Sequence, residues 1–135
     1  MKRLILFIVL QASICLPGFA QNEIDQLVNN YSAISTSKYT SAVERNPKNR
    51  TIIKVVKMLD MEYTNVTPFV NAFKKERAQG DFSERKVGDD LIMTLTTQTT
   101  KQNRIYMLKA EDYYINGKVH NAKSACSVTI IVKMK

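Results

Sequence analysis

Apart from Ile131, apolar and polar side chains alternate with a period of two along the last ten residues of the chain. The apolar set is Cys126, Val128, Ile130, Val132 and Met134, and the polar set is Ser127, Thr129, Lys133 and Lys135. Successive side chains of a β-strand point to opposite faces of its sheet, so this period predicts a strand with one buried and one solvated face. Such a strand needs a sheet around it and a second layer to cover its apolar face.

Further strands are predicted upstream, and each is bounded by residues that favour turns. These strands are 82–87, 91–99, 104–110, 113–115 and 118–120. In 91–99 the side chains of Leu91, Met93 and Leu95 alternate with Ile92, Thr94 and Thr96. Asn116-Gly117, between the last two strands, is the strongest short signal for a two-residue hairpin.

The segment 39–59 is predicted to form another hairpin, with arms 39–45 and 50–59. Asn46-Pro47-Lys48-Asn49 favours a turn between them, because Asn opens a turn well and Pro presets the backbone angle at its second position. The spacing of Ile52, Val56 and Leu59 also fits a helical face, so a helix is the alternative for the second arm. The β-branched residues in this arm favour the strand.

A helix is predicted close to residue 22. Asn22 is a good N-cap, and Glu23 and Asp25 suit the positive end of the helix dipole. One apolar stripe then follows at helical spacing: Ile24, Leu27, Val28, Tyr31 and Ile34.

A second helix is predicted to begin at Thr67-Pro68, with Thr67 as its cap and Pro68 at the first helical position. Its buried face is formed by Phe69, Val70 and Phe73, and its solvated face by Lys74, Lys75 and Arg77. We expect Gly80 to end it.

These elements predict an α+β fold, with a single, mostly antiparallel sheet and two helices packed on one face, in the order α-β-β-α-β-β-β. The other face of the sheet is expected to show Thr, Lys and Gln side chains to solvent, as antiparallel sheets permit. No repeat or low-complexity linker interrupts residues 21–135. We therefore expect 21–135 to form one small domain, while the sequence leaves its oligomeric state open.

Residues 1–20 have the three parts of a secretory signal peptide. Lys2 and Arg3 form a positive start, 4–10 is a compact apolar run, and Gly18-Phe19-Ala20 places small residues before a cleavage site. A membrane-spanning helix needs about 20 apolar residues, and this run is far shorter. The pattern predicts export to the periplasm or the exterior of a Gram-negative cell, with cleavage between Ala20 and Gln21 and no transmembrane segment in the mature chain.

The two cysteines bear on this interpretation. Cys15 would carry a lipid anchor in the alternative of a lipoprotein signal, but Ile14 stands where a small residue is expected. Cleavage after Ala20 leaves Cys126 alone, which argues against a disulfide-stapled scaffold. Because Cys126 lies on the apolar side of its strand, we expect a buried thiol that does not react.

Residues suited to catalysis are few. His120 is the only histidine, and Asp89-Asp90 and Glu111-Asp112 are adjacent carboxylates that do not converge in a strand or a turn. The sequence has no phosphate-binding Gly loop, zinc-spaced Cys pair or nucleophile elbow. We therefore expect no catalytic residues, metal or cofactor. A small enzyme or enzyme inhibitor with its site near the Tyr113–His120 hairpin is the alternative.

The charge of the mature chain predicts a different kind of site. Cleavage removes 20 of the 135 residues and leaves 115. It also removes Lys2 and Arg3, so that 18 of the 20 Lys and Arg remain against 12 Asp and Glu, and the net charge is +6. The predicted binding residues are Lys109, Lys133, Lys135, Thr129, Tyr113 and Tyr114, with Lys101 and Arg104 on the same solvated face. The expected partner is an acidic glycan, lipopolysaccharide or an envelope protein. This charge is too small for a dedicated nucleic-acid binder, and the alternative is that the lysines only keep the sheet soluble.

The chain also resembles a known class of proteins. The segments that carry the resemblance are "IDQLVNNYSAI", "SAVERNPKNRTIIKVVKML", "TLTTQTTKQNRIYMLK" and "VTIIVKMK", after a signal that ends in Ala-Gln. Together they are similar to small exported proteins of the Bacteroidetes type, a domain-of-unknown-function family. The resemblance implies a Gram-negative, exported α+β domain and assigns no site residue. The helix-then-sheet layout also resembles cystatin-type inhibitors, although their Gln-Val-x-Gly-type loop is missing here.

Overall fold

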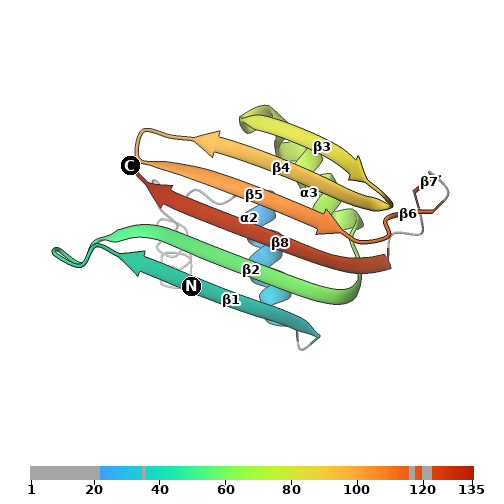
Figure 1. Ribbon diagram of the computed structural model, residues 1–135, viewed down its shortest axis with the longest axis horizontal. Helices are drawn as coiled ribbons and strands as arrows, with labels where there is room; N and C mark the ends of the chain where they lie inside the picture. The colour runs from blue at the N-terminus through green and yellow to red at the C-terminus, as the bar shows by residue number, and fades with distance from the viewer. Residues whose placement is uncertain (1–21, 35, 116–117, 120–122) are drawn as a thin grey trace, which may run out of the picture.

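The computed structural model describes residues 22–34, 36–115, 118–119 and 123–135, which form an antiparallel sheet of six strands with two α-helices (Figure 1). The α+β class and the single, mostly antiparallel main sheet are therefore confirmed. The predicted signal peptide with Cys15, Ala20 and Gln21, the hairpin residues Asn116-Gly117 and His120 lie outside the described residues.

The main sheet places the last strand of the chain in its interior. The elements are α2 (Glu23–Ser32), β1 (Ser37–Arg45), β2 (Ile52–Asn65), α3 (Thr67–Glu76), η1 (Arg77–Gln79), β3 (Asp81–Val87), β4 (Asp90–Gln98), β5 (Gln102–Ala110), β6 (Tyr114–Ile115), β7 (Lys118–Val119) and β8 (Lys123–Met134). The strand order is β1-β2-β8-β5-β4-β3, while β6 and β7 form a separate two-stranded ribbon. The predicted order, with three strands after the second helix, is wrong, because six strands follow α3.

The hairpin of β1 and β2 decides between a strand and a helix for the second arm, predicted at 50–59. Residues 52–65 form one antiparallel strand paired with β1 on one side and β8 on the other. The turn is supported by its own side chains, since the Lys48 N–H donates to Asn46 Oδ1 and the Thr51 N–H donates to Asn49 Oδ1. Pairing on both edges explains why the β-branched run is a strand and not a helix.

Helix α2 begins as predicted. Asn22 Oδ1 accepts from the Asp25 N–H at 2.9 Å, and Asp25 Oδ2 accepts from the Asn22 N–H at 3.1 Å, which completes a capping box. Ile24 and Val28 are buried, and Leu27 and Tyr31 pack against the same core. Ile34, which was predicted to continue the stripe, lies beyond the helix and is exposed.

Helix α3 begins one residue earlier than the sequence suggests. Val66 is its N-cap and Thr67 its first helical residue, so the prediction of Thr67 as the cap is wrong. Asn65 Oδ1 accepts from the Thr67 N–H at 3.0 Å instead. Phe69, Val70 and Phe73 are buried as predicted, and the chain reaches Gly80 after the short helix η1.

The core lies between the helices and one face of the sheet. Both helices lie behind the sheet in Figure 1, and residues of α2 and α3 join those of β2, β4, β5 and β8 in one buried cluster. The sheet contributes Leu59, Met61, Leu91, Met93, Leu95, Tyr106, Leu108, Ala110, Cys126, Val128, Ile130 and Val132. The predicted alternations in 91–99 and 126–134 are therefore confirmed.

The opposite face of the sheet, called the open face below, is less polar than predicted. By register it carries the even-numbered residues of β1, of β4 and, up to the bulge after Met61, of β2, together with the odd-numbered residues of β3, β5 and β8. Thr40, Thr94, Thr96 and Thr129 lie there, but so do Val56, Met58, Ile92, Ile105, Met107 and Ile131. The expectation of a Thr, Lys and Gln face is correct only in part.

Candidate functional site

The predicted binding residues do not form one cluster. Lys109 and Lys133 both lie on the open face of neighbouring strands, opposite Ser127 and Asn103 respectively. Six positions of β5 separate these two registers, which is roughly 20 Å at about 3.4 Å per residue. Lys109 is therefore near one end of the sheet and Lys133 near the other, with Thr129 between them.

Lys133 instead belongs to a cluster that the sequence reasoning missed. Its cross-strand neighbour on β2 is Lys54, and the Lys135 N–H donates to the Lys101 carbonyl at 2.9 Å. The β1–β2 turn lies at the same end of the sheet (Figure 1). We call this set of side chains the basic end: Arg45, Lys48, Arg50, Lys54, Lys101, Lys133 and Lys135.

The basic end contains little negative charge. It is built from the segments 44–54, 98–103 and 133–135, all of which the structure describes, and Glu44 is the only acidic side chain among them. Glu44 lies opposite Lys54 on β1. The β1–β2 turn is held in place, because Arg45 Nη1 donates to the Arg50 carbonyl at 3.1 Å and the Arg50 N–H donates to the Asn46 carbonyl at 2.8 Å. Seven cationic side chains are thus presented by ordered backbone.

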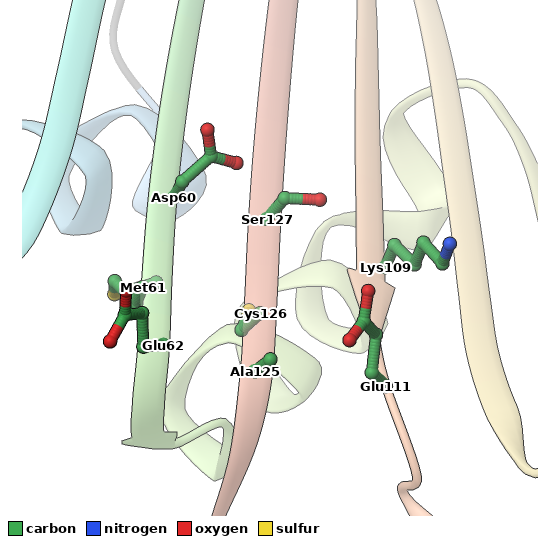
Figure 2. A pocket seen from close by; sticks show the side chains of 8 residues that line it. All are labelled: Asp60, Met61, Glu62, Lys109, Glu111, Ala125, Cys126 and Ser127. Carbon is green, nitrogen blue, oxygen red and sulfur yellow. The ribbon is translucent and has the colours of Figure 1, made fainter.

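The other end of the sheet contains a pocket of about 270 Å³ (Figure 2). Its lining is Asp60, Met61, Glu62, Lys109, Glu111, Ala125, Cys126 and Ser127. Figure 2 shows the Asp60 carboxylate directed toward β8, while Lys109 turns toward β4. The pocket lining holds three carboxylates and one lysine, so this end of the sheet is more acidic than the basic end. Within the described residues, no group of three or more His, Cys, Asp and Glu could hold a metal ion.

The thiol in this pocket is buried and holds its proton. Cys126 is buried, with 3% of its surface exposed. Burial raises the pKa of its thiol to about 12, and the charge of Asp60 adds to the shift. The reactive thiolate is therefore a negligible fraction at neutral pH, as the position of Cys126 in the sequence predicts.

Tyr113 and Tyr114 lie at the other end of the sheet from Lys133 and Lys135 and contact each other. Their rings meet edge to face at 5.2 Å between centroids, and Lys86 Nζ lies 5.1 Å from the centre of the Tyr114 ring. The Tyr114 N–H donates to the Asp89 carbonyl at 3.0 Å. Both residues are half-buried, and burial raises the pKa of each hydroxyl. They hold the chain after β5 against the β3–β4 turn.

A buried polar network lies between α2 and β5. Asp25 Oδ2 accepts from the Tyr106 hydroxyl at 3.1 Å and from Arg104 Nη1 at 3.3 Å, and Arg104 Nε donates to Gln102 Oε1. Burial and then the charge of Asp25 raise the pKa of Tyr106 to about 12. The assignment of Arg104 to the solvated face is wrong. Arg104 alternates along β5 with Tyr106 and Leu108, two residues apart in each case, and this spacing could have predicted that its side chain faces the core.

No helix within the described part of the chain is long and apolar enough to cross a membrane. The proposed site near the Tyr113–His120 hairpin remains a hypothesis, since His120 lies outside the described residues. In comparisons with protein-family models, curated proteins and solved structures, the chain has no match.

Proposed function

We propose that this protein is an exported, non-enzymatic binding module that takes an acidic ligand at the basic end of its sheet. One observation carries the proposal: seven Lys and Arg side chains from three described segments lie at one end of the sheet, with Glu44 as the only acidic side chain in those segments. A local excess of one charge attracts ligands of the opposite charge and raises their concentration at the surface.

The exposure of these residues suggests the kind of ligand. Arg45, Lys48, Arg50, Lys101, Lys133 and Lys135 are all exposed. Exposed ion pairs are individually weak, at about 0.2–1 kcal/mol. A ligand with a single carboxylate would therefore gain little here. A repeating polyanion can contact several cations at once, so an acidic glycan or the phosphates of lipopolysaccharide fits this surface best.

The experiment compares two variants with the same loss of charge. The full-length chain is expressed in a Gram-negative host, and the exported protein is purified from the periplasm. Lys48, Lys101 and Lys135→Gln removes three charges from the basic end, while Lys74, Lys86 and Lys118→Gln removes three exposed charges elsewhere. Binding to heparin and to lipopolysaccharide is measured between about 0.01 M and 0.5 M salt.

We expect wild-type binding to weaken steeply as salt rises, because the Debye length falls from about 30 Å at 0.01 M to about 8 Å at physiological ionic strength. Loss of three contacts at roughly 0.5 kcal/mol each predicts about tenfold weaker binding for the basic-end variant. The control should bind nearly as the wild type does. Equal losses in both variants, or no wild-type binding at low salt, would contradict the proposal.

A further inference from the structure

The middle of the open face is an apolar band. In one cross-strand row lie Ala42, Val56, Ile131, Ile105 and Thr96, and in the next lie Thr40, Met58, Thr129, Met107 and Thr94. On the edge strand β3 these rows end at the polar residues Asp81 and Ser83. Met58 and Met107 are 43% and 38% exposed, respectively. The helices cover the other face, so the band has no partner within the described chain. A contiguous apolar patch with a polar rim is typical of an interaction surface.

Charged rows border this band on both sides. The row toward the basic end is formed by Glu44, Lys54, Lys133, Asn103 and Gln98, and the row toward the pocket by Lys38, Asp60, Ser127, Lys109, Ile92 and Arg85. Among the described residues the salt bridges are Lys75–Glu23 and Arg104–Asp25. The charges of the two border rows are therefore not engaged in ion pairs with other described residues.

We propose that a second copy of this chain covers the apolar band, face to face and with its strands antiparallel to those of the first. A two-fold axis that lies parallel to the sheet and perpendicular to the strands places each strand over its own copy, reversed in direction. Lys54 then faces Asp60 of the second copy, and Glu44 faces Lys38 of the second copy. The two-fold relation creates each of these ion pairs twice.

The charges select this arrangement over the other face-to-face dimer. A two-fold axis parallel to the strands would reverse the strand order instead. Lys54 and Lys133 would then face Gln98 and Asn103 of the second copy, and Lys38 would face Arg85 of the second copy. Like charges brought together in this way oppose association. The antiparallel arrangement avoids this contact and places Lys54 and Glu44 opposite residues of the other sign.

The size of the face is sufficient for a specific dimer. Six strands about 4.8 Å apart, over a length of about 24 Å, give roughly 700 Å² per copy. The total of about 1,400 Å² lies within the range of specific interfaces, about 1,200–2,000 Å². Two such sheets stack about 10 Å apart with nearly aligned strands, as in a β-sandwich. The helices would then form the two outer layers.

This inference goes beyond the proposed function and does not depend on it. The β1–β2 turn, Lys101 and Lys135 lie at the edge of the stacked sheets, so the dimer would present two basic regions at opposite ends. The two ideas can be tested separately, because one predicts an oligomeric state and the other predicts binding to polyanions.

The first test is the oligomeric state of the exported protein, measured by sedimentation equilibrium from about 1 µM to 500 µM. Met107→Lys places a charge in the centre of the band and should raise the dimer dissociation constant at least tenfold. Val119→Lys is the matched control, since Val119 is also an exposed apolar residue, 60% exposed, but lies in β7. Circular dichroism and the melting temperature show whether each variant is folded.

The second test is a charge exchange that only the antiparallel arrangement explains. Lys54→Glu and Asp60→Lys should each weaken the dimer severalfold, because each places like charges opposite one another. The double variant should recover most of the wild-type affinity.

A wild-type protein that remains monomeric up to 500 µM would overturn the inference, as would a dimer unaffected by Met107→Lys. Failure of the double variant to recover would overturn the antiparallel arrangement. Heparin binding by a strictly monomeric protein would leave the proposed function standing while this inference falls.

Discussion

At the scale of single residues, Cys126 shows how position sets reactivity. It faces the core from β8, and the alternation of its strand placed it there. Burial disfavours the charged thiolate and keeps the proton on sulfur. We expect Cys126 to react with a thiol reagent in the folded protein at least 100-fold more slowly than in urea. Rapid reaction of the native protein would show that this part of β8 opens to solvent.

The same burial makes stability depend on pH. Burial raises the pKa values of the Cys126 thiol and the Tyr106 hydroxyl to about 12. In the unfolded chain the pKa values of a Cys thiol and a Tyr hydroxyl are about 8.5 and 10, respectively. Between pH 9 and 12 the unfolded state therefore binds fewer protons than the folded state, and the free energy of unfolding falls as pH rises. Their contribution is fully present below about pH 8.5.

Urea unfolding of the wild type and of Cys126→Ala at several pH values measures this effect. The variant should be less stable at neutral pH, because it loses buried sulfur contacts. Its free energy of unfolding should fall less steeply above pH 9, because one shifted group is gone. Parallel pH curves for the two proteins would show that Cys126 does not contribute to the alkaline loss of stability.

At the scale of elements, the junction between η1 and β3 depends on Gly80. A Cβ built at Gly80 would lie 2.1 Å from the Thr96 carbonyl oxygen, which is backbone of the neighbouring strand β4. The sequence predicts Gly80 as the end of a helix, but its close approach to β4 appears only when the strands are paired. Its role is therefore one of packing, since its φ of −177° is open to any residue.

We predict that Gly80→Ala lowers the free energy of unfolding by about 2–3 kcal/mol, because backbone must shift to relieve the overlap. Gly88→Ala is the matched comparison. Gly88 has a φ of 62° and no atom within 4 Å of its added Cβ, so only backbone strain of about 1 kcal/mol is expected there. Chemical denaturation of both variants checks the ranking, and a larger loss at Gly88 would contradict it.

At the scale of the whole molecule, charge is unevenly distributed along the strands. The basic end and the acidic pocket lie at opposite ends of the same sheet. Binding to polyanions and antiparallel association both follow from this polarity. The proposed binding to polyanions also requires that the protein leaves the cytoplasm in a processed form, because the proposed ligands belong to the cell envelope.

The N-terminus of the exported protein tests that requirement. We expect mass spectrometry of the periplasmic protein to show a chain that begins at Gln21, with or without cyclisation of that residue. A diacylglyceryl group on Cys15 would show instead that the lipid-anchored alternative is correct. A chain that still begins at Met1 and is found in the cytoplasm would remove the basis for an envelope ligand.

What the sequence by itself determined about this protein is local. The strands, the helix α2 with its Asn22 cap and the inward side of Cys126 could be predicted because they depend on periods of two or 3.6 residues and on caps a few residues away. Tertiary structure decided which strands are neighbours. Only the insertion of β8 between β2 and β5 places Lys54 beside Lys133, and only the packing of α2 brings Asp25 to Arg104. Asp25 and Arg104 are 79 positions apart in the chain. Contacts between residues this far apart leave no period in the sequence.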